Sequence, residues 1–279
     1  MTLTGGYGPI AQADALDVLR YAIDAGVALL DTADAYLGGE ELVAQAVHGR
    51  VDRPLIVTKC GLGGEPGRRW SCGRPDYLAQ ACAASRQRLR VETLDAILLH
   101  RVDPLVPVEE SIGALAALRE QGLVAQIGIC TSDPAVVRRS AAIAPLAFVE
   151  APLSILNPEP AKELLAAVRS ADAVLLAHSP LVRGVAAKHS SKPSYEPGDA
   201  RAHIPELRDH ALLSRAARLA RDAQQLGISR VALALGWLVS LGPDVVPLPG
   251  VRTRRQSRES LDAQRDLPPD VSAAVAAFF

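Results

Sequence analysis

The chain has 279 residues, of which 49% are hydrophobic, so a large core can form without disulfides or metals. Thirty basic residues stand against thirty-one acidic ones, which gives a net charge of −1. Since no basic tract stands out from this balance, we expect neither nucleic acid nor a membrane surface as a partner. We expect a single domain over residues 1–279, because α/β barrels of roughly 250 residues commonly form one.

The cysteines and the first residues of the chain indicate the cellular compartment in which the protein is expected. Four irregularly spaced cysteines predict neither a zinc site nor a disulfide framework, and they fit a reducing cytoplasm. The opening MTLTGGYGPI has neither the basic nor the apolar segment of a signal peptide. No apolar run reaches the ~18 residues that a membrane helix needs. We therefore expect a cytoplasmic protein without bound metal.

In chain order, short apolar runs alternate with segments of helical period, which predicts βα units around a parallel sheet. The predicted strands are 27–31, 54–59, 96–100, 125–130, 147–151, 173–179 and 244–250. The predicted helices include 14–25, 75–89, 107–120, 159–170, 211–225 and 230–241, several of which begin at Pro, Ser or Asp. Residues 188–207, rich in Ser, Pro, Gly and Asp, predict a long loop over one face of the fold.

Seven strands are one fewer than a (β/α)8 barrel requires, and the shortfall lies at the front, where only MTLTGG precedes the first helix. The expected fold class is therefore an α/β, (β/α)8 TIM-type barrel whose first strand is truncated or missing. Two explanations are open: a gene start placed too late, or a gap that a partner subunit covers. For the second reason we allow for a homo-oligomer.

Three apolar strands end on a polar or charged residue: Asp31, Lys59 and His100. The carboxyl ends of parallel barrel strands form the active-site face, so these side chains should converge there, joined by Tyr36 from the following loop. Taken alone, Asp31 can be a helix or turn cap and His100 a hydrogen-bonded structural residue. Lys59 is harder to explain structurally, because the chain has only four lysines among its thirty basic residues.

Together these four residues suit acid/base chemistry on a carbonyl oxygen. A phenol has an ordinary pKa of about 10, and a buried ammonium nearby stabilises the phenolate and should lower the pKa of Tyr36. Asp31 would keep Lys59 charged away from water, and His100 would donate to the substrate oxygen.

Six ordered blocks of the chain resemble the aldo-keto reductases. The blocks are GVALLDTADAYLGGEELVAQAV, IVTKCG, SRQRLRVETLDAILLHRVDP, PVEESIGALAALREQGLVAQIGI, AHSPLVRG and VALALGWLVSLGPDVVPLPGVRTRRQSRESL. The resemblance implies an NADP(H)-dependent reductase in which the nicotinamide supplies hydride to an aldehyde or ketone. It also implies that Asp31, Tyr36, Lys59 and His100 are the catalytic residues.

The resemblance further implies where the cofactor binds. The positions that hold the adenosine 2′-phosphate and adenine correspond to Gly250, Arg252, Arg254, Gln256, Glu259 and Ser260, and arginines at a helix amino terminus suit a phosphate. A solvated basic face is the structural alternative. The remaining cofactor positions correspond to Cys130, Thr131, Glu150, His178, Ser179, Pro180, Leu181, Arg183 and Gly184.

Three positions near the nicotinamide differ from the family's usual residues. Cys130 replaces a serine, Glu150 replaces a glutamine that can both donate and accept, and His178 replaces a stacking tyrosine. Two alternatives to a reductase follow from these changes. One is a non-redox enzyme that catalyses elimination, epimerisation or cyclisation with the same acid/base residues, and the other is a cofactor-sensing regulatory subunit.

Overall fold

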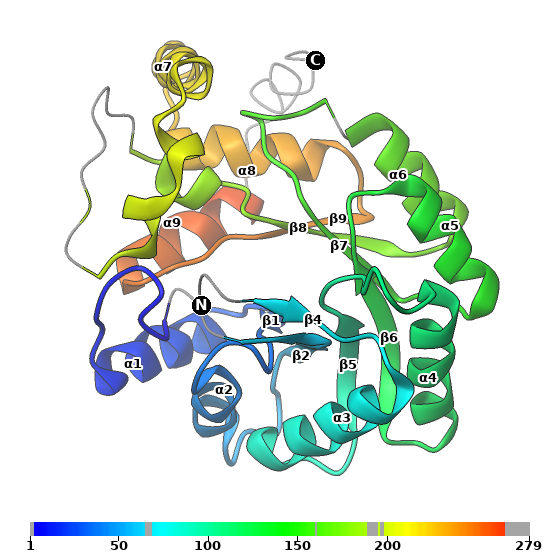
Figure 1. Ribbon diagram of the computed structural model, residues 1–279. Helices are drawn as coiled ribbons and strands as arrows, with labels where there is room; N and C mark the ends of the chain where they lie inside the picture. Colours follow the sequence, from blue (N-terminus) through cyan, green and yellow to red (C-terminus); the bar gives the residue numbers. More distant parts are fainter. Residues whose placement is uncertain (1–2, 65–68, 160, 189–194, 196–197, 266–279) are drawn as a thin grey trace. The chain divides into compact units, whose positions relative to one another are not determined.

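The computed structural model describes residues 3–64, 69–159, 161–188, 195 and 198–265 (Figure 1). Its contacts divide the chain into two compact units, which are described separately below. The first comprises Met1–Ala25, Pro152–Ala161 and Leu176–Phe279, and the second comprises Gly26–Ala151 and Lys162–Leu175. The single-domain organisation stays a prediction.

Seven of the described strands form one sheet in the order β1-β2-β5-β6-β7-β8-β9. They are β1 (Leu29–Asp31), β2 (Leu55–Cys60), β5 (Leu94–Leu99), β6 (Val124–Cys130), β7 (Phe148–Pro152), β8 (Val174–His178) and β9 (Val245–Leu248). Pairing from β1 to β7 is parallel throughout. Each strand matches a segment predicted from the sequence. A separate antiparallel pair, β3 (Leu62–Gly63) and β4 (Trp70–Ser71), was not predicted.

The α-helices alternate with these strands along the chain, except that α7 and α8 both lie between β8 and β9. They are α1 (Gln12–Asp24), α2 (Gly39–Val47), α3 (Pro75–Leu89), α4 (Val108–Glu120), α5 (Pro134–Ile143), α6 (Ala161–Ser170), α7 (His210–Gln225), α8 (Arg230–Ser240) and α9 (Arg254–Arg265). Several begin as their sequences dictate, with Pro in the first turn of α3 and α5 and Ser229 capping α8 through its hydroxyl. Among the described residues, no helix is both long and apolar enough to cross a bilayer.

The core of the second unit lies between β2, β5 and β6 and the helices α2, α3 and α4, which run beside one another (Figure 1). The residues Ala96–Leu99 of β5 have no exposed surface, as expected for a strand covered on both faces. Gly128 of β6 permits close strand packing, because a Cβ there would lie 2.2 Å from the carbonyl oxygen of Phe148.

A buried polar cluster joins the helices of this unit to β2. Glu40 of α2 is 1% exposed, and its carboxylate accepts hydrogen bonds from Thr58 Oγ1 at 2.5 Å and Arg88 Nε at 2.6 Å. Thr58 precedes Lys59 and points to the opposite face of β2. The cluster therefore holds β2 in place from the face of the strand opposite to Lys59.

Replacing Glu40 with alanine should lower the free energy of unfolding by about 1–3 kcal/mol, because Arg88 and Thr58 lose their buried acceptor. Urea unfolding of the purified variant measures this loss. Glu41→Ala, the next position in α2, is the matched control and should cost less. Equal costs for the two variants would show that the cluster does not stabilise the fold.

In the first unit, α9 packs against both α1 and α8, and α7 packs against α8. Ahead of α1 the described residues contain no strand, only isolated bridges such as Tyr7 with Asp199. The predicted loop 188–207 is described only in part, because 189–194 and 196–197 lie outside the described residues. Its described end contains the 3₁₀ helices η2 (Ala200–His203) and η3 (Pro205–Arg208).

Candidate active site

The four residues predicted to be catalytic all lie in the second unit. Asp31 ends β1, Lys59 is the penultimate residue of β2, and His100 directly follows β5. Tyr36 lies in the turn between β1 and α2. Since β1, β2 and β5 are parallel neighbours in the sheet, their carboxyl ends bring these side chains to one place.

Lys59 is the centre of this cluster and has no exposed surface. Its Nζ donates to Asp31 Oδ1 and, at 3.0 Å, to the carbonyl oxygen of Thr32. The same nitrogen lies 3.2 Å from Glu150 Oε2. Burial alone would lower the pKa of Lys59, but the carboxyl groups of Asp31 and Glu150 outweigh it and raise the pKa above its ordinary value. Lys59 therefore remains charged at neutral pH.

Tyr36 lies between this lysine and His100. Lys59 Nζ is 5.6 Å from the centroid of the Tyr36 ring, and the His100 ring meets the Tyr36 ring edge-on at 5.7 Å. Burial raises the pKa of Tyr36, and the ammonium of Lys59 opposes that rise without overcoming it. The expectation that Lys59 holds the pKa of Tyr36 below its ordinary value is thus wrong for the protein alone. The phenol is fully protonated at neutral pH.

Three of the predicted cofactor residues adjoin the same cluster. Cys130 ends β6 and pairs in register with Glu150 of β7, while Thr131 donates its backbone N–H to the Glu150 carbonyl oxygen at 3.0 Å. Burial raises the pKa of the Cys130 thiol, and the neighbouring Glu150 adds to that effect. Burial and the negative charge of Asp31 raise the pKa of Glu150 to about 8.

The residues that hold the Tyr36 turn were not predicted from the sequence. Arg69 donates to the carbonyl oxygen of Ala35 at 3.3 Å through its NH1 and NH2 groups, and the Asp34 N–H donates to the carbonyl oxygen of Lys59 at 3.1 Å. Burial, followed by repulsion from Glu40, raises the pKa of Asp34 to about 7. In the sequence DTADAY, a polar residue two positions before Tyr36, Asp34, was the only signal for this role.

The predicted cofactor residues from His178 to Gly184 lie in the first unit, where His178 ends β8 and the others follow that strand. His178 Nδ1 is 3.1 Å from Ser179 Oγ. Three non-glycine residues here have positive φ angles: 55° at Ser179, 45° at Val182 and 54° at Arg183. Such conformations are costly and concentrate at ligand sites, which agrees with a binding role for this segment.

The predicted phosphate residues meet in the first unit at the start of α9, which begins at Arg254. There the Arg252 N–H donates to Gln256 Oε1 at 2.8 Å, Ser260 is buried, and Glu259 lies 4.0 Å from Arg255. Gly250 is the second residue after β9.

Two of these arginines also have protein partners that the sequence did not suggest. The Arg252 guanidinium donates to the carbonyl oxygens of Gly8 and Pro9 at 3.1 and 2.8 Å. Arg254 forms a bidentate ion pair with Asp17 of α1. A phosphate at this helix start would therefore compete with Asp17 for Arg254.

The fold and this cluster define a class of protein: an α/β enzyme in which parallel strands carry a buried lysine, a tyrosine and a histidine suited to acid/base chemistry. The sequence profile of the Aldo/keto reductase family matches residues 1–278. The chain belongs to this family of oxidoreductases.

Two relatives are similar over most of their length. An aldo-keto reductase of Strobilurus tenacellus is 29% identical over 93% of this chain and 79% of its own, and a probable aldo-keto reductase of Glycine max is 30% identical over 94% and 78%. Among solved structures, a glycerol dehydrogenase from Gluconobacter oxydans has a TM-score of 0.85 at 25% identity over 99% of this chain and 88% of its own. A Klebsiella pneumoniae aldo/keto reductase in complex with NADP and acetate has a TM-score of 0.73 at 22% identity over 98% and 88%. These likenesses confirm the predicted (β/α)8 fold class.

Proposed function

We propose that this protein is an NADP(H)-dependent reductase that converts an aldehyde or ketone to an alcohol, with Tyr36 as the general acid. The observation that carries the proposal is the position of Lys59. It is fully buried, held by Asp31, and 5.6 Å from the ring of Tyr36. A charge placed there without water stabilises an anion that forms on Tyr36 or on the substrate oxygen.

Each residue would have a distinct role in the reaction. Tyr36 is protonated at neutral pH and donates its proton as negative charge develops on the carbonyl oxygen. Lys59 then stabilises the remaining phenolate, and Asp31 keeps the lysine charged and in place. His100, whose ring packs against Tyr36, would donate to the substrate oxygen and orient it.

NADP(H) would supply the hydride. The proposed cofactor residues are Cys130, Thr131, Glu150, His178, Ser179, Pro180, Leu181, Arg183, Gly184, Gly250, Arg252, Arg254, Gln256, Glu259 and Ser260. Their chemistry fits, because Arg252 and Arg254 flank the amino terminus of α9, where backbone N–H groups and guanidinium groups suit a phosphate monoester. The NADP complex of the Klebsiella enzyme also supports this cofactor.

Fluorescence titration with NADPH, followed by a panel of aldehydes and ketones, tests the proposal. We expect saturable binding and substrate-dependent loss of NADPH. No binding at ~100 μM, a concentration well within the usual range of KM values, would contradict it. Binding without turnover would favour a cofactor sensor, and conversion of a substrate without loss of NADPH would favour a non-redox enzyme.

Arg254→Ala should weaken NADPH binding by about 10- to 100-fold while leaving NADH binding nearly unchanged, because a charge-assisted hydrogen bond contributes about 1.5–3 kcal/mol. Titrations with both cofactors measure the difference. Arg258→Ala is a matched control, because Arg258 lies one turn later on α9 and also contacts α1, through Tyr21 Oη at 2.9 Å. Equal losses for NADH and NADPH would remove Arg254 from the 2′-phosphate site.

A further inference from the structure

Glu150 places a second carboxyl group beside the buried Lys59. It is 4% exposed, and its Oε2 lies 3.2 Å from Lys59 Nζ. That oxygen has no well-aligned hydrogen-bond donor among the described residues. Lys59 instead directs its hydrogen bonds to Asp31 and to the carbonyl oxygen of Thr32.

The charges in this cluster do not balance if every group is ionised. Asp31 and Glu150 would contribute two negative charges against the single positive charge of Lys59. An isolated excess charge is costly away from water, and proteins avoid it by retaining a proton. One of the two carboxyl groups is therefore expected to retain a proton.

The geometry decides which carboxyl group keeps that proton. The Asp31 side chain is 20% exposed and accepts a direct hydrogen bond from Lys59, and both features favour its ionised form. The Glu150 side chain is only 5% exposed and is poorly aligned with Lys59. The neutral form is therefore favoured at Glu150.

We propose that Glu150 holds a proton at neutral pH and acts through Lys59 as a positioning residue, so that its ionisation sets the charge that Tyr36 experiences. Within its unit, the titratable groups that face Glu150 are Asp31 of β1, Tyr36 of the following turn, Lys59 of β2 and Cys130 of β6. Only Lys59 among them is positive. A pKa of about 8 for Glu150 agrees with this assignment.

The protonation state of Glu150 should affect catalysis. This effect rests on the proposed function, whereas the presence of the proton on Glu150 does not depend on that function. When Glu150 is neutral, Lys59 balances Asp31 alone and the cluster carries no net charge. When Glu150 ionises, a second negative charge opposes formation of the Tyr36 phenolate. The rate of the chemical step should then fall on the alkaline side, and Glu150→Gln should move or remove that limb of the pH profile.

The pH dependence of thermal stability tests the proton directly, without substrate or cofactor. Because the pKa of Glu150 is raised on folding, its protonated form stabilises the native protein, and that contribution is lost as pH rises toward about 8. The difference in Tm between Glu150→Gln and the wild type should therefore grow in favour of the variant from about pH 5 to about pH 8 and then level off. Glu120→Gln, at an exposed position on α4, is the control and should show no such trend.

A flat difference, or one that turns against the variant as pH rises, would overturn the proposal, because it would mean that Glu150 is ionised and paired with Lys59. Carbon-13 NMR of protein labelled only at the glutamate side-chain carboxyl groups gives the same answer in the wild type. One signal should titrate with a midpoint near 8, and it should be absent from Glu150→Gln. If every glutamate titrates in the ordinary acidic range, the proposal fails whatever the enzyme's activity.

Discussion

Replacement of Tyr36 with phenylalanine is expected to lower kcat/KM for carbonyl reduction by about 10²- to 10⁴-fold, the usual contribution of a positioned general acid. Phenylalanine keeps the ring that packs against His100 and removes only the hydroxyl. NADPH affinity should therefore remain within a few fold of the wild-type value. Steady-state kinetics and a fluorescence titration on the same preparation separate the two effects.

Tyr77→Phe is the matched control for this variant. Tyr77 belongs to α3, where its ring packs edge-on against Trp70 at 5.5 Å between ring centroids. The Tyr77→Phe substitution should leave kcat unchanged. If Tyr36→Phe retains most of its activity, Tyr36 is not the general acid. If it loses activity only through weaker NADPH binding, the role of Tyr36 is in binding and not in proton transfer.

Lys59→Met is expected to abolish carbonyl reduction and to lower the free energy of unfolding by about 3–5 kcal/mol, the range found when one partner of a buried ion pair is removed. Methionine has a similar length, but it leaves Asp31 and Glu150 without a counter-charge. Burial already raises the pKa of Glu150, and loss of the Lys59 ammonium should raise that pKa further. The stabilising protonated form of Glu150 is lost as pH rises, so the deficit should be larger at about pH 10 than at about pH 7.

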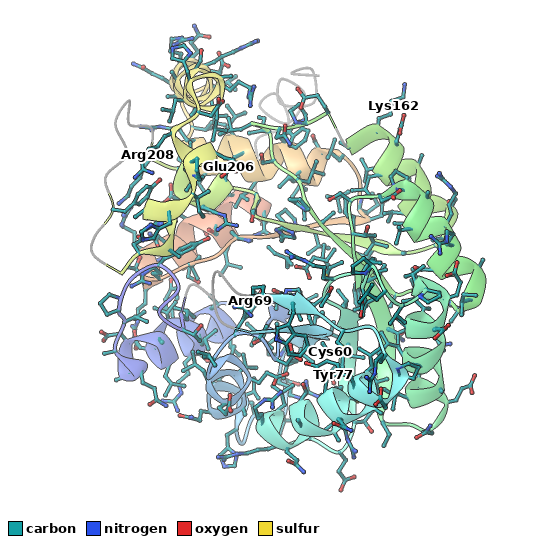
Figure 2. All side chains as sticks on the ribbon, in the orientation of Figure 1. Cys60, Arg69, Tyr77, Lys162, Glu206 and Arg208 are labelled. Carbon is teal, nitrogen blue, oxygen red and sulfur yellow. The ribbon has the colours of Figure 1, made fainter. Side chains whose placement is uncertain are left out.

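Urea unfolding at both pH values measures this deficit. Lys162→Met provides the control, because Lys162 is exposed on α6 (Figure 2) and should change stability little. A deficit below about 1 kcal/mol, as surface ion pairs give, would show that Lys59 is not held as a buried charge. A deficit independent of pH would exclude a further rise in the pKa of Glu150 as one of its causes.

The strands were predictable because each is a short apolar run, and in a parallel sheet both faces of such a run are buried. β1 begins at Leu29 rather than at residue 27, and β5 begins at Leu94 rather than at residue 96. The helices α2 and α5 were not among the predicted segments, and of α9 only the amino terminus at the arginine cluster was expected. α9 carries many charged residues, and its place in the fold depends on packing against α1 and α8, which no local pattern in the sequence reveals.

The site was predictable to the extent that it follows from strand ends. Asp31, Lys59 and His100 were identified because each interrupts or ends an apolar run, and parallel strands bring those ends together. The charge of the cluster was not predictable, because Glu150 reaches Lys59 only through the pairing of β2, β5, β6 and β7. The direction of the Tyr36 pKa shift also depends on burial, which outweighs the effect of Lys59.

The central claim, hydride transfer to a carbonyl carbon, is tested most directly with NADPH that carries deuterium at C4 of the nicotinamide. We predict that the wild-type protein converts an aldehyde or ketone to an alcohol with deuterium at the former carbonyl carbon, and that Tyr36→Phe forms this product far more slowly. A product without deuterium, or conversion that leaves the labelled NADPH intact, would contradict the account.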